Sequence, residues 1–150
     1  MKIIIASDIR GYKLKEKLVK YLVKKGIEIE DLSQDPKVFK DYPFYAFEIG
    51  EKVANKEFDF GVIICRTGIG SSIACNKVKG IRCAKVDNVK EAKLTRYDNN
   101  SNVLALNGSL PTYRAKDIID TFLKTKFSGI DRHQRRINII SNYEGVIQND

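Results

Sequence analysis

Short apolar runs alternate with amphipathic segments along the whole chain. Residues 3–6 and 62–65 are continuous apolar runs, as expected of strands buried on both faces. Between them, Leu14, Leu18 and Leu22 recur at helical spacing until Gly26, which can end the helix. The pattern predicts strands at 3–6, 27–32, 60–65, 81–86 and 102–106. It predicts a first helix that ends at Gly26 and further helices at 43–54, 69–77, 89–97, 113–123 and 131–146.

Strands that alternate with helices predict an α/β fold with a parallel sheet covered by helices on both faces. We expect five parallel strands in a doubly wound, Rossmann-like three-layer sandwich. The 150 residues, 43% of them hydrophobic, can build a core without metals or disulfides, so we expect a single domain over 1–150. No strand follows the helix predicted at 131–146, and we expect that helix to extend to a neighbouring subunit.

The cysteines and the histidine restrict the chemistry. Cys65, Cys75 and Cys83 lack CxxC spacing, and His133 is the only histidine. This set supports neither a disulfide framework nor a zinc site, and we expect no metal and no cofactor. The apolar runs are far shorter than a membrane span, and the N-terminus lacks a basic-then-apolar signal pattern. We therefore expect a cytoplasmic protein with reduced thiols and no membrane partner.

The formal net charge of +8 would suit a nucleic-acid partner. Many lysines, however, punctuate helical patterns and indicate a solvated face, among them Lys13, Lys15, Lys17 and Lys20. Only residues 132–136 come close to a basic block. An anionic small molecule accounts for the same excess of charge, so we expect no nucleic acid. Salt-sensitive binding to DNA or RNA is the alternative.

Ligands of open parallel sheets bind at the carboxyl ends of the strands, and this chain carries unusual residues there. Asp8 follows the first strand, and its carboxylate could accept hydrogen bonds from ligand hydroxyls. Asp8 could equally well cap the helix that follows. The residue type alone does not separate the two interpretations.

The third strand leads into the segment 65–70, which reads CRTGIG. Its glycines let the backbone approach a ligand, and the N–H groups that open the next helix would face a developing oxyanion. That positive helix end and Arg66 would favour the thiolate of Cys65, the form in which cysteine acts as a base or nucleophile. Thr67 adds a hydroxyl. A small buried core residue is the alternative for Cys65, and by residue type alone it is the more frequent one.

Six segments, spread over residues 2 to about 140, resemble in order and spacing the family of ribose-5-phosphate isomerase B and galactose-6-phosphate isomerase. They are 6–8, 41–43, 61–70, 74–82, 102–105 and 132–136. The Cys-x-Thr-Gly-Ile-Gly stretch from Cys65 and the Asn-Lys-Val-x-Gly-Ile-Arg stretch from Asn76 are together the most specific.

The resemblance implies an aldose–ketose isomerase, an intramolecular oxidoreductase that moves a carbonyl between C1 and C2 of a phosphorylated sugar through a cis-enediol(ate). Such a reaction needs one base, an oxyanion environment and a phosphate anchor. Cys65 corresponds to the base. Thr67 and the amides of Gly68, Ile69 and Gly70 correspond to the region that stabilises the enediolate.

The resemblance also implies the binding residues and the assembly. Asp8, Tyr42 and Asn99 correspond to residues that contact the sugar, and Arg132 and Arg136 to the phosphate-binding arginines. The two arginines are one turn apart on the predicted last helix, so both guanidinium groups can face one phosphate; a solvated basic helix is the alternative. The family forms dimers or dimers of dimers with the site between subunits. We expect a homodimer, or a hetero-oligomer with a related subunit.

Four positions depart from the family pattern. Ile9 stands where a histidine usually follows the aspartate, and Asp98 stands where a histidine opens the furanose ring. Ser109 replaces a further phosphate-binding arginine, and Arg66 replaces a glycine. Arg10 and Arg66 would restore the lost positive charge. Asp98 is kept as the candidate ring-opening acid, a role that requires it to hold a proton near neutrality, as burial could favour.

These departures leave the substrate open. We expect the interconversion of ribose 5-phosphate and ribulose 5-phosphate. A galactose-6-phosphate isomerase, or one acting on another hexose or pentose phosphate, is the alternative, since the galactose-branch subunit that keeps the cysteine lacks the ring-opening histidine and needs a partner. A catalytically impaired protein that only binds a sugar phosphate is the third interpretation.

Overall fold

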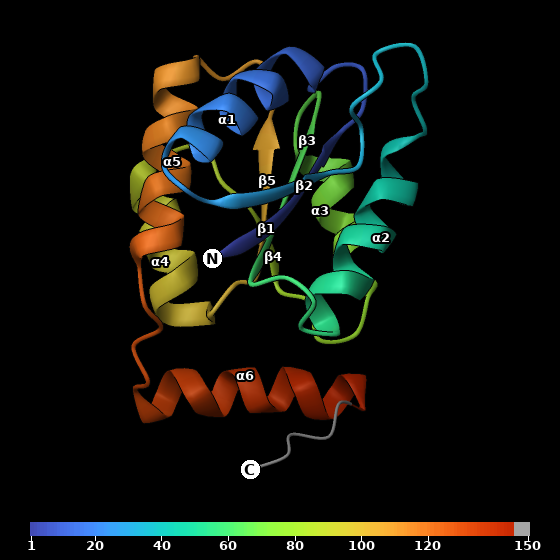
Figure 1. The fold of residues 1–150 in the computed structure, drawn as a ribbon. Coiled ribbons are helices and arrows are strands. Elements are labelled where there is room, and N and C mark those ends of the chain that lie inside the picture. Colours follow the sequence, from blue (N-terminus) through green and yellow to red (C-terminus); the bar gives the residue numbers. More distant parts are fainter. Residues whose placement is uncertain (146–150) are drawn as a thin grey trace.

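The computed structural model describes residues 1–145. Five parallel strands form one sheet with the order β2-β1-β3-β5-β4 (Figure 1). The strands are β1 (Lys2–Ser7), β2 (Glu28–Asp31), β3 (Phe60–Cys65), β4 (Cys83–Lys85) and β5 (Val103–Asn107). The helices are α1 (Tyr12–Lys24), α2 (Tyr42–Ala54), α3 (Ile69–Cys75), α4 (Val89–Asn99), α5 (Thr112–Lys124) and α6 (Asp131–Glu144). The predicted doubly wound α/β fold is confirmed.

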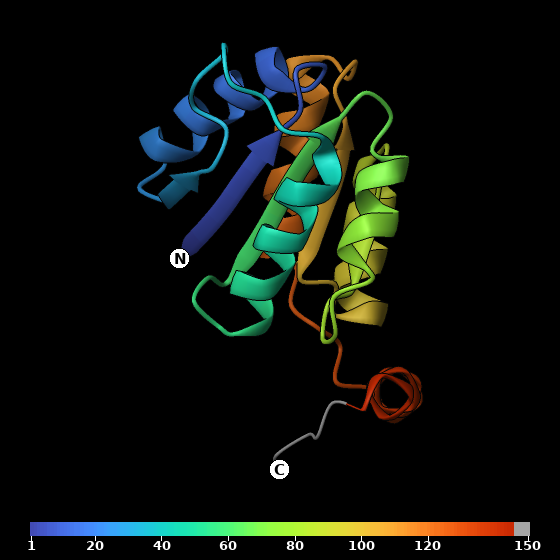
Figure 2. The same cartoon turned by 90° about the vertical axis from the view of Figure 1, so that its right-hand side faces the viewer.

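The period-two alternation of the strands divides the core into two layers. Ile3 and Ile5 of β1 pack with residues of α1, α4 and α5, whereas Ile4 and Ala6 pack with residues of α2 and α3. All four side chains are fully buried. Burial on both faces explains why β1 is continuously apolar. Figure 2 shows α2 and α3 side by side on their face of the sheet.

Two predicted strands are too long. β2 spans Glu28–Asp31 rather than 27–32. β4 spans Cys83–Lys85 rather than 81–86. The N–H of Ile81 donates to the carbonyl of Val78 at 3.2 Å in a turn, and the N–H of Arg82 donates to the side chain of Asn102 at 2.8 Å, so neither joins the strand ladder. Within residues 1–145, no helix combines the length and the apolar character needed to cross a bilayer.

α6 lies apart from the two helical layers, across the edge at which the strands begin (Figure 1). It buries His133, Ile137 and Ser141. Glu144 accepts the backbone N–H of Gly80 at 3.0 Å and ties the end of the helix to the loop before β4. α6 ends at Glu144, and the predicted end at 146 lies outside the described residues. Docking of this helix on a neighbouring subunit stays a prediction.

Lys15 of α1 is fully buried, and its assignment to a solvated face is therefore wrong. Its ammonium group bonds a carboxylate oxygen of Asp31 at 2.6 Å and the carbonyl of Ser33 at 2.8 Å. It also lies 4.6 Å from the centre of the Tyr12 ring. A buried ammonium is stable only when its protons are paired. The interaction fixes the start of α1, and with it the loop after β1, against the end of β2.

We expect Lys15→Ala to lower the free energy of unfolding by about 3–5 kcal/mol, because it leaves the Asp31 carboxylate largely buried without its cation. Lys13→Ala, an exposed lysine on the same helix, should change it by no more than about 0.5 kcal/mol. Urea unfolding followed by circular dichroism measures both. Equal, small effects would contradict a structural role for Lys15.

Candidate active site

The carboxyl ends of β1, β3 and β5 meet at one edge of the sheet. In the parallel register Ser7 is paired with Ile64, and Cys65 is paired with Asn107. The carbonyl of Cys65 accepts the N–H of Gly108 at 2.8 Å. The loops that follow the three strands therefore lie next to one another, with Cys65 in the middle.

Gly108 is a point of close approach between these loops. A Cβ atom at this position would lie 2.8 Å from the carbonyl oxygen of Arg10 and 3.1 Å from that of Cys65. Carbon atoms do not approach backbone oxygens this closely without a shift of the chain, so a side chain here would push the loops apart. Glycine is thus needed to close the backbone around the end of β3.

Cys65 is only 4% exposed, and polar groups surround its sulfur. The N–H of Gly68 donates to Sγ at 3.2 Å, and Oγ of Ser71 lies 3.1 Å from Sγ. Gly68 has a φ of 78°, a left-handed conformation that directs its N–H back to the strand end. Cys65 is therefore a buried residue, as the alternative interpretation held, but one whose sulfur receives an amide proton that stabilises negative charge.

Thr67 lies in the loop after Cys65, and Ile69 and Gly70 lie in the first turn of α3. Thr67 is exposed, and its Oγ1 accepts the N–H of Ile69 at 3.2 Å. The Tyr42 ring covers Gly70 so closely that a Cβ atom there would lie 2.5 Å from the phenolic oxygen. The structure thus brings Tyr42, from the first turn of α2, to the loop that carries Cys65.

Asp8 belongs to the same edge of the sheet. Its Oδ1 accepts the N–H groups of Arg10 at 2.9 Å and Gly11 at 3.0 Å. Asp8 therefore closes the turn before α1 and is not the helix cap: the N-cap of α1 is Gly11, and no side chain caps it. Ile9, Arg10 and Arg66 are exposed at this edge.

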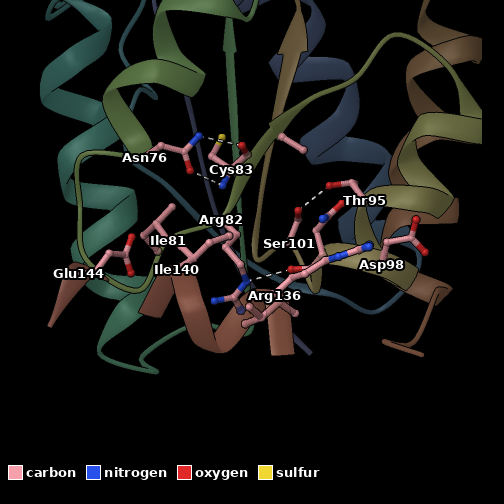
Figure 3. A pocket seen from close by; sticks show the side chains of 13 residues that line it. Asn76, Ile81, Arg82, Cys83, Thr95, Asp98, Ser101, Arg136, Ile140 and Glu144 are labelled. Atoms are coloured by element: carbon pink, nitrogen blue, oxygen red, sulfur yellow. Dashed lines mark hydrogen bonds between the residues drawn. The ribbon is translucent and has the colours of Figure 1, made fainter. Parts of the chain in front are cut away.

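The remaining predicted residues lie at the opposite edge of the sheet. Asp98 and Asn99 at the end of α4, together with Arg136 of α6, line a cavity of about 470 Å³ in front of β4 (Figure 3). Arg132 is exposed on α6, one turn before Arg136. A single chain therefore does not bring these residues together with Cys65.

His133 connects α6 to the end of α4. It is 5% exposed, its Nδ1 lies 2.9 Å from Oγ of Ser128, and the edge of its ring contacts Tyr97. The same nitrogen lies 3.7 Å from Oδ1 of Asp98. The Asp98 side chain is 39% exposed. A ring-opening acid at this position needs burial to hold its proton near neutrality, and the single chain does not provide that burial.

Arg82 is a cavity residue to which the sequence assigned no role. Its Nε donates to the carbonyl of Asn99 at 3.0 Å, and its Nη2 donates to the carbonyl of Asn100 at 3.0 Å. Burial lowers the pKa of Arg82, an effect that Glu144 opposes, and arginine remains charged at neutral pH. The sequence feature that could have identified Arg82 is its place at the end of the Asn-Lys-Val-x-Gly-Ile-Arg stretch. Figure 3 shows Arg82 and Arg136 together in the cavity.

The other cysteines do not resemble Cys65. Hydrogen bonding to Cys75 and burial raise the pKa of the Cys83 thiol well above its ordinary value, so that thiol stays protonated. Sγ of Cys75 donates to the carbonyl of Ala46 at 3.6 Å. Among the described residues, no group of three or more His, Cys, Asp or Glu side chains is placed to hold a metal ion.

Comparisons with known proteins agree on one family. The model of the family described as Ribose/Galactose Isomerase matches residues 3–140. Ribose-5-phosphate isomerase B of Escherichia coli is 38% identical over 144 residues, which cover 95% of this chain and 96% of the relative.

Two solved structures are also similar. A ribose 5-phosphate isomerase from Thermotoga maritima has a TM-score of 0.90 and 44% identity, and the match covers 94% of this chain and 97% of that one. Ribose-5-phosphate isomerase B from Mycoplasma genitalium, solved with bound ribulose-5-phosphate, has a TM-score of 0.88 and 41% identity, with 97% of each chain covered.

Proposed function

Because this chain belongs to the ribose/galactose isomerase family, we propose that it interconverts ribose 5-phosphate and ribulose 5-phosphate. The observation that carries the proposal is the Cys65 thiol, held at the end of β3 beneath the amide of Gly68. The relative from Mycoplasma genitalium binds ribulose-5-phosphate, which supports this choice of substrate.

In the proposed reaction, Cys65 is the base of the proton shift. Its thiolate takes the proton from C2 of the open-chain aldose, and the C–H electron pair becomes part of the enediolate as the C1 carbonyl oxygen gains negative charge. The new S–H then returns its proton to C1, while the proton of the C2 hydroxyl passes to the C1 oxygen and the C2 oxygen becomes the carbonyl of the ketose. No electrons leave the sugar, so the step balances without a redox partner.

The loop geometry narrows which groups can stabilise the enediolate. The N–H of Gly68 is directed at the sulfur, and that of Ile69 is bonded to Thr67. We therefore assign this role to the Thr67 hydroxyl and the amide of Gly70. Asp8 and Tyr42, at the same edge, are the proposed contacts to the sugar hydroxyls.

The phosphate anchor of the proposal lies on a second subunit. Arg132 and Arg136 are placed on α6, at the edge of the sheet opposite to that of Cys65 (Figure 1). A homodimer in which the Cys65 edge of each subunit meets the α6 edge of its partner completes two sites. Asp98, Asn99 and Arg82 would then face the sugar as well.

Exposed apolar side chains support such an assembly. They lie on α2, α3 and α6 and are Phe44, Phe47, Ile69, Ile73, Ile139, Ile140 and Tyr143. Tyr143 is 94% exposed in the single chain. Apolar side chains gathered on neighbouring helices are typical of a surface that another subunit covers.

The proposal keeps galactose 6-phosphate as the alternative substrate, favoured by one observation, the presence of Asp98 in place of the ring-opening histidine. It also places the enzyme in the cytoplasm. Its three cysteines are free thiols, which is in keeping with a reducing compartment.

Solvent deuterium should enter C1 or C2 of ribose 5-phosphate in the presence of the purified protein, and Cys65→Ala should abolish the exchange. Nuclear magnetic resonance of the recovered sugar measures the deuterium. Cys75→Ala is the matched control and should retain exchange. Exchange with galactose 6-phosphate alone would favour the alternative substrate, and no exchange with any pentose or hexose phosphate would exclude an isomerase.

Mixing two inactive variants should restore activity. In a dimer of one Cys65→Ala subunit and one Arg136→Ala subunit, one of the two sites combines an intact Cys65 edge with an intact α6 edge. Refolding a 1:1 mixture should therefore return about one quarter of the wild-type rate, since half of the dimers are mixed. A mixture as inactive as its components would contradict sites shared between subunits.

Charge reversal at Arg66 should weaken substrate binding. Arg66→Glu places a negative charge beside a phosphorylated sugar, and we expect KM to rise about tenfold with a smaller change in kcat. Steady-state kinetics at low ionic strength measure both values. Lys24→Glu, the same reversal at the far end of α1, should leave KM unchanged. An unaltered KM in Arg66→Glu would remove Arg66 from the substrate site.

A further inference from the structure

Ser71 of α3 is fully buried, and its hydroxyl lies beside the Cys65 thiol. The distance from Oγ to Sγ is 3.1 Å, and Oγ also lies 3.3 Å from the carbonyl oxygen of Gly68. Buried hydroxyls are almost always hydrogen-bonded. This hydroxyl has a single proton and two acceptors within reach, the sulfur and the carbonyl.

The two positions of that proton match the two states of the cysteine. When Cys65 is a thiol, its S–H can donate to Ser71 while the hydroxyl donates to the carbonyl of Gly68. When Cys65 is a thiolate, the hydroxyl can turn to the sulfur, which then accepts two hydrogen bonds, one from Ser71 and one from the N–H of Gly68 at 3.2 Å. Every donor is used in both states, and the exchange needs only rotation of one hydroxyl.

We propose that Ser71 is a positioning residue for Cys65, whose hydroxyl stabilises the thiolate before the proton shift and changes acceptor when the sulfur takes up the proton. The inference rests on the proposed function for the role of Cys65 as the base. Because Ser71 is fully buried, it acts through Cys65 and not on the sugar. Hydrogen bonds to a charged acceptor are the stronger kind, so the exchange of acceptors favours the charged sulfur.

Ser72 provides an internal comparison. Its Oγ donates to the carbonyl of Ile69 at 2.8 Å, three residues back along the chain, as Ser71 can donate to Gly68. Local bonds of this kind are common for serine and need no functional explanation. The contact with the sulfur is what distinguishes Ser71 from Ser72.

The charged and titratable groups around the loop do not change when Ser71 is replaced. They lie in the loop after β1, the start of α2, the loop after β3, the end of β4 and the turn after it, and are Asp8, Arg10, Tyr42, Arg66, Lys85 and Asp87. Lys85 is paired with Asp87. A change in the protonation of Cys65 on replacement of Ser71 would therefore report the lost hydroxyl.

The test is the pH dependence of Cys65 alkylation by iodoacetamide in the purified protein without sugar. Mass spectrometry of the Cys65 peptide separates it from Cys75 and Cys83. Ser71→Ala should move the midpoint of the rate profile upward by about one pH unit, the effect of one charge-assisted hydrogen bond. The acidic limb of kcat/KM for isomerisation should move by the same amount. Ser71→Thr, which keeps the hydroxyl, and Ser72→Ala should keep the wild-type midpoint.

An unchanged midpoint in Ser71→Ala would overturn the proposal, and so would an equal shift in Ser72→Ala. Circular dichroism shows whether Ser71→Ala folds. If it does not fold, Ser71→Thr is the test, because this variant keeps the hydroxyl. A folded Ser71→Thr variant whose alkylation midpoint differs from that of the wild type would contradict the proposed role of the hydroxyl. The protein could also show a shifted alkylation midpoint in Ser71→Ala and yet isomerise no sugar. That result would support the Ser71–Cys65 interaction and contradict the proposed function, so the two failures are distinguishable.

Discussion

The site at the carboxyl edge depends on where β3 ends relative to β1 and β5. The carbonyl of Cys65 is bonded to Gly108, and the N–H of Asp8 donates to the carbonyl of Ile64, so the last residues of β3 are held from both sides. A slip of one residue in this register would turn Cys65 to the other face of the sheet, toward α1 and α5 and away from Ser71. The sulfur, its amide donor and its hydroxyl neighbour are therefore consequences of strand pairing.

The opposite edge is organised around α6. His133 packs against the end of α4, and Glu144 holds the loop before β4, so the helix is attached near both of its ends. Arg136 thereby reaches the cavity beside Arg82 and Asp98. Two arginines at the rim of one cavity favour a dianionic ligand, and the surrounding backbone carbonyls orient Arg82.

Sequence reasoning succeeded where one local signal decides the structure. The apolar run of β3 predicts its bounds correctly, because both faces of that strand are covered. The apolar pattern did not predict the bounds of β4, since Ile81 is as deeply buried in a turn as it would be in a strand. Helical periodicity also could not show that Lys15 meets Asp31, because that contact joins elements distant in the sequence.

The residues of the site divide in the same way. Cys65 ends β3 and Asp8 follows β1, so both can be found from the positions of the strands alone. Four other predicted residues lie on helices, where only the family resemblance identified them. They are Asp98, Asn99, Arg132 and Arg136. Ser71 escaped both kinds of reasoning, because a serine one turn into a helix is ordinary until its neighbour is known to be Cys65.

The placement of Cys65 and Arg136 at opposite edges of one sheet also restricts the symmetry of the proposed assembly. In the proposed shared site, each chain would contribute one edge to a partner, a head-to-tail relation that would propagate into a fibre if successive copies were stacked by translation. A twofold axis would let both edges of two chains be satisfied at once and would close the assembly.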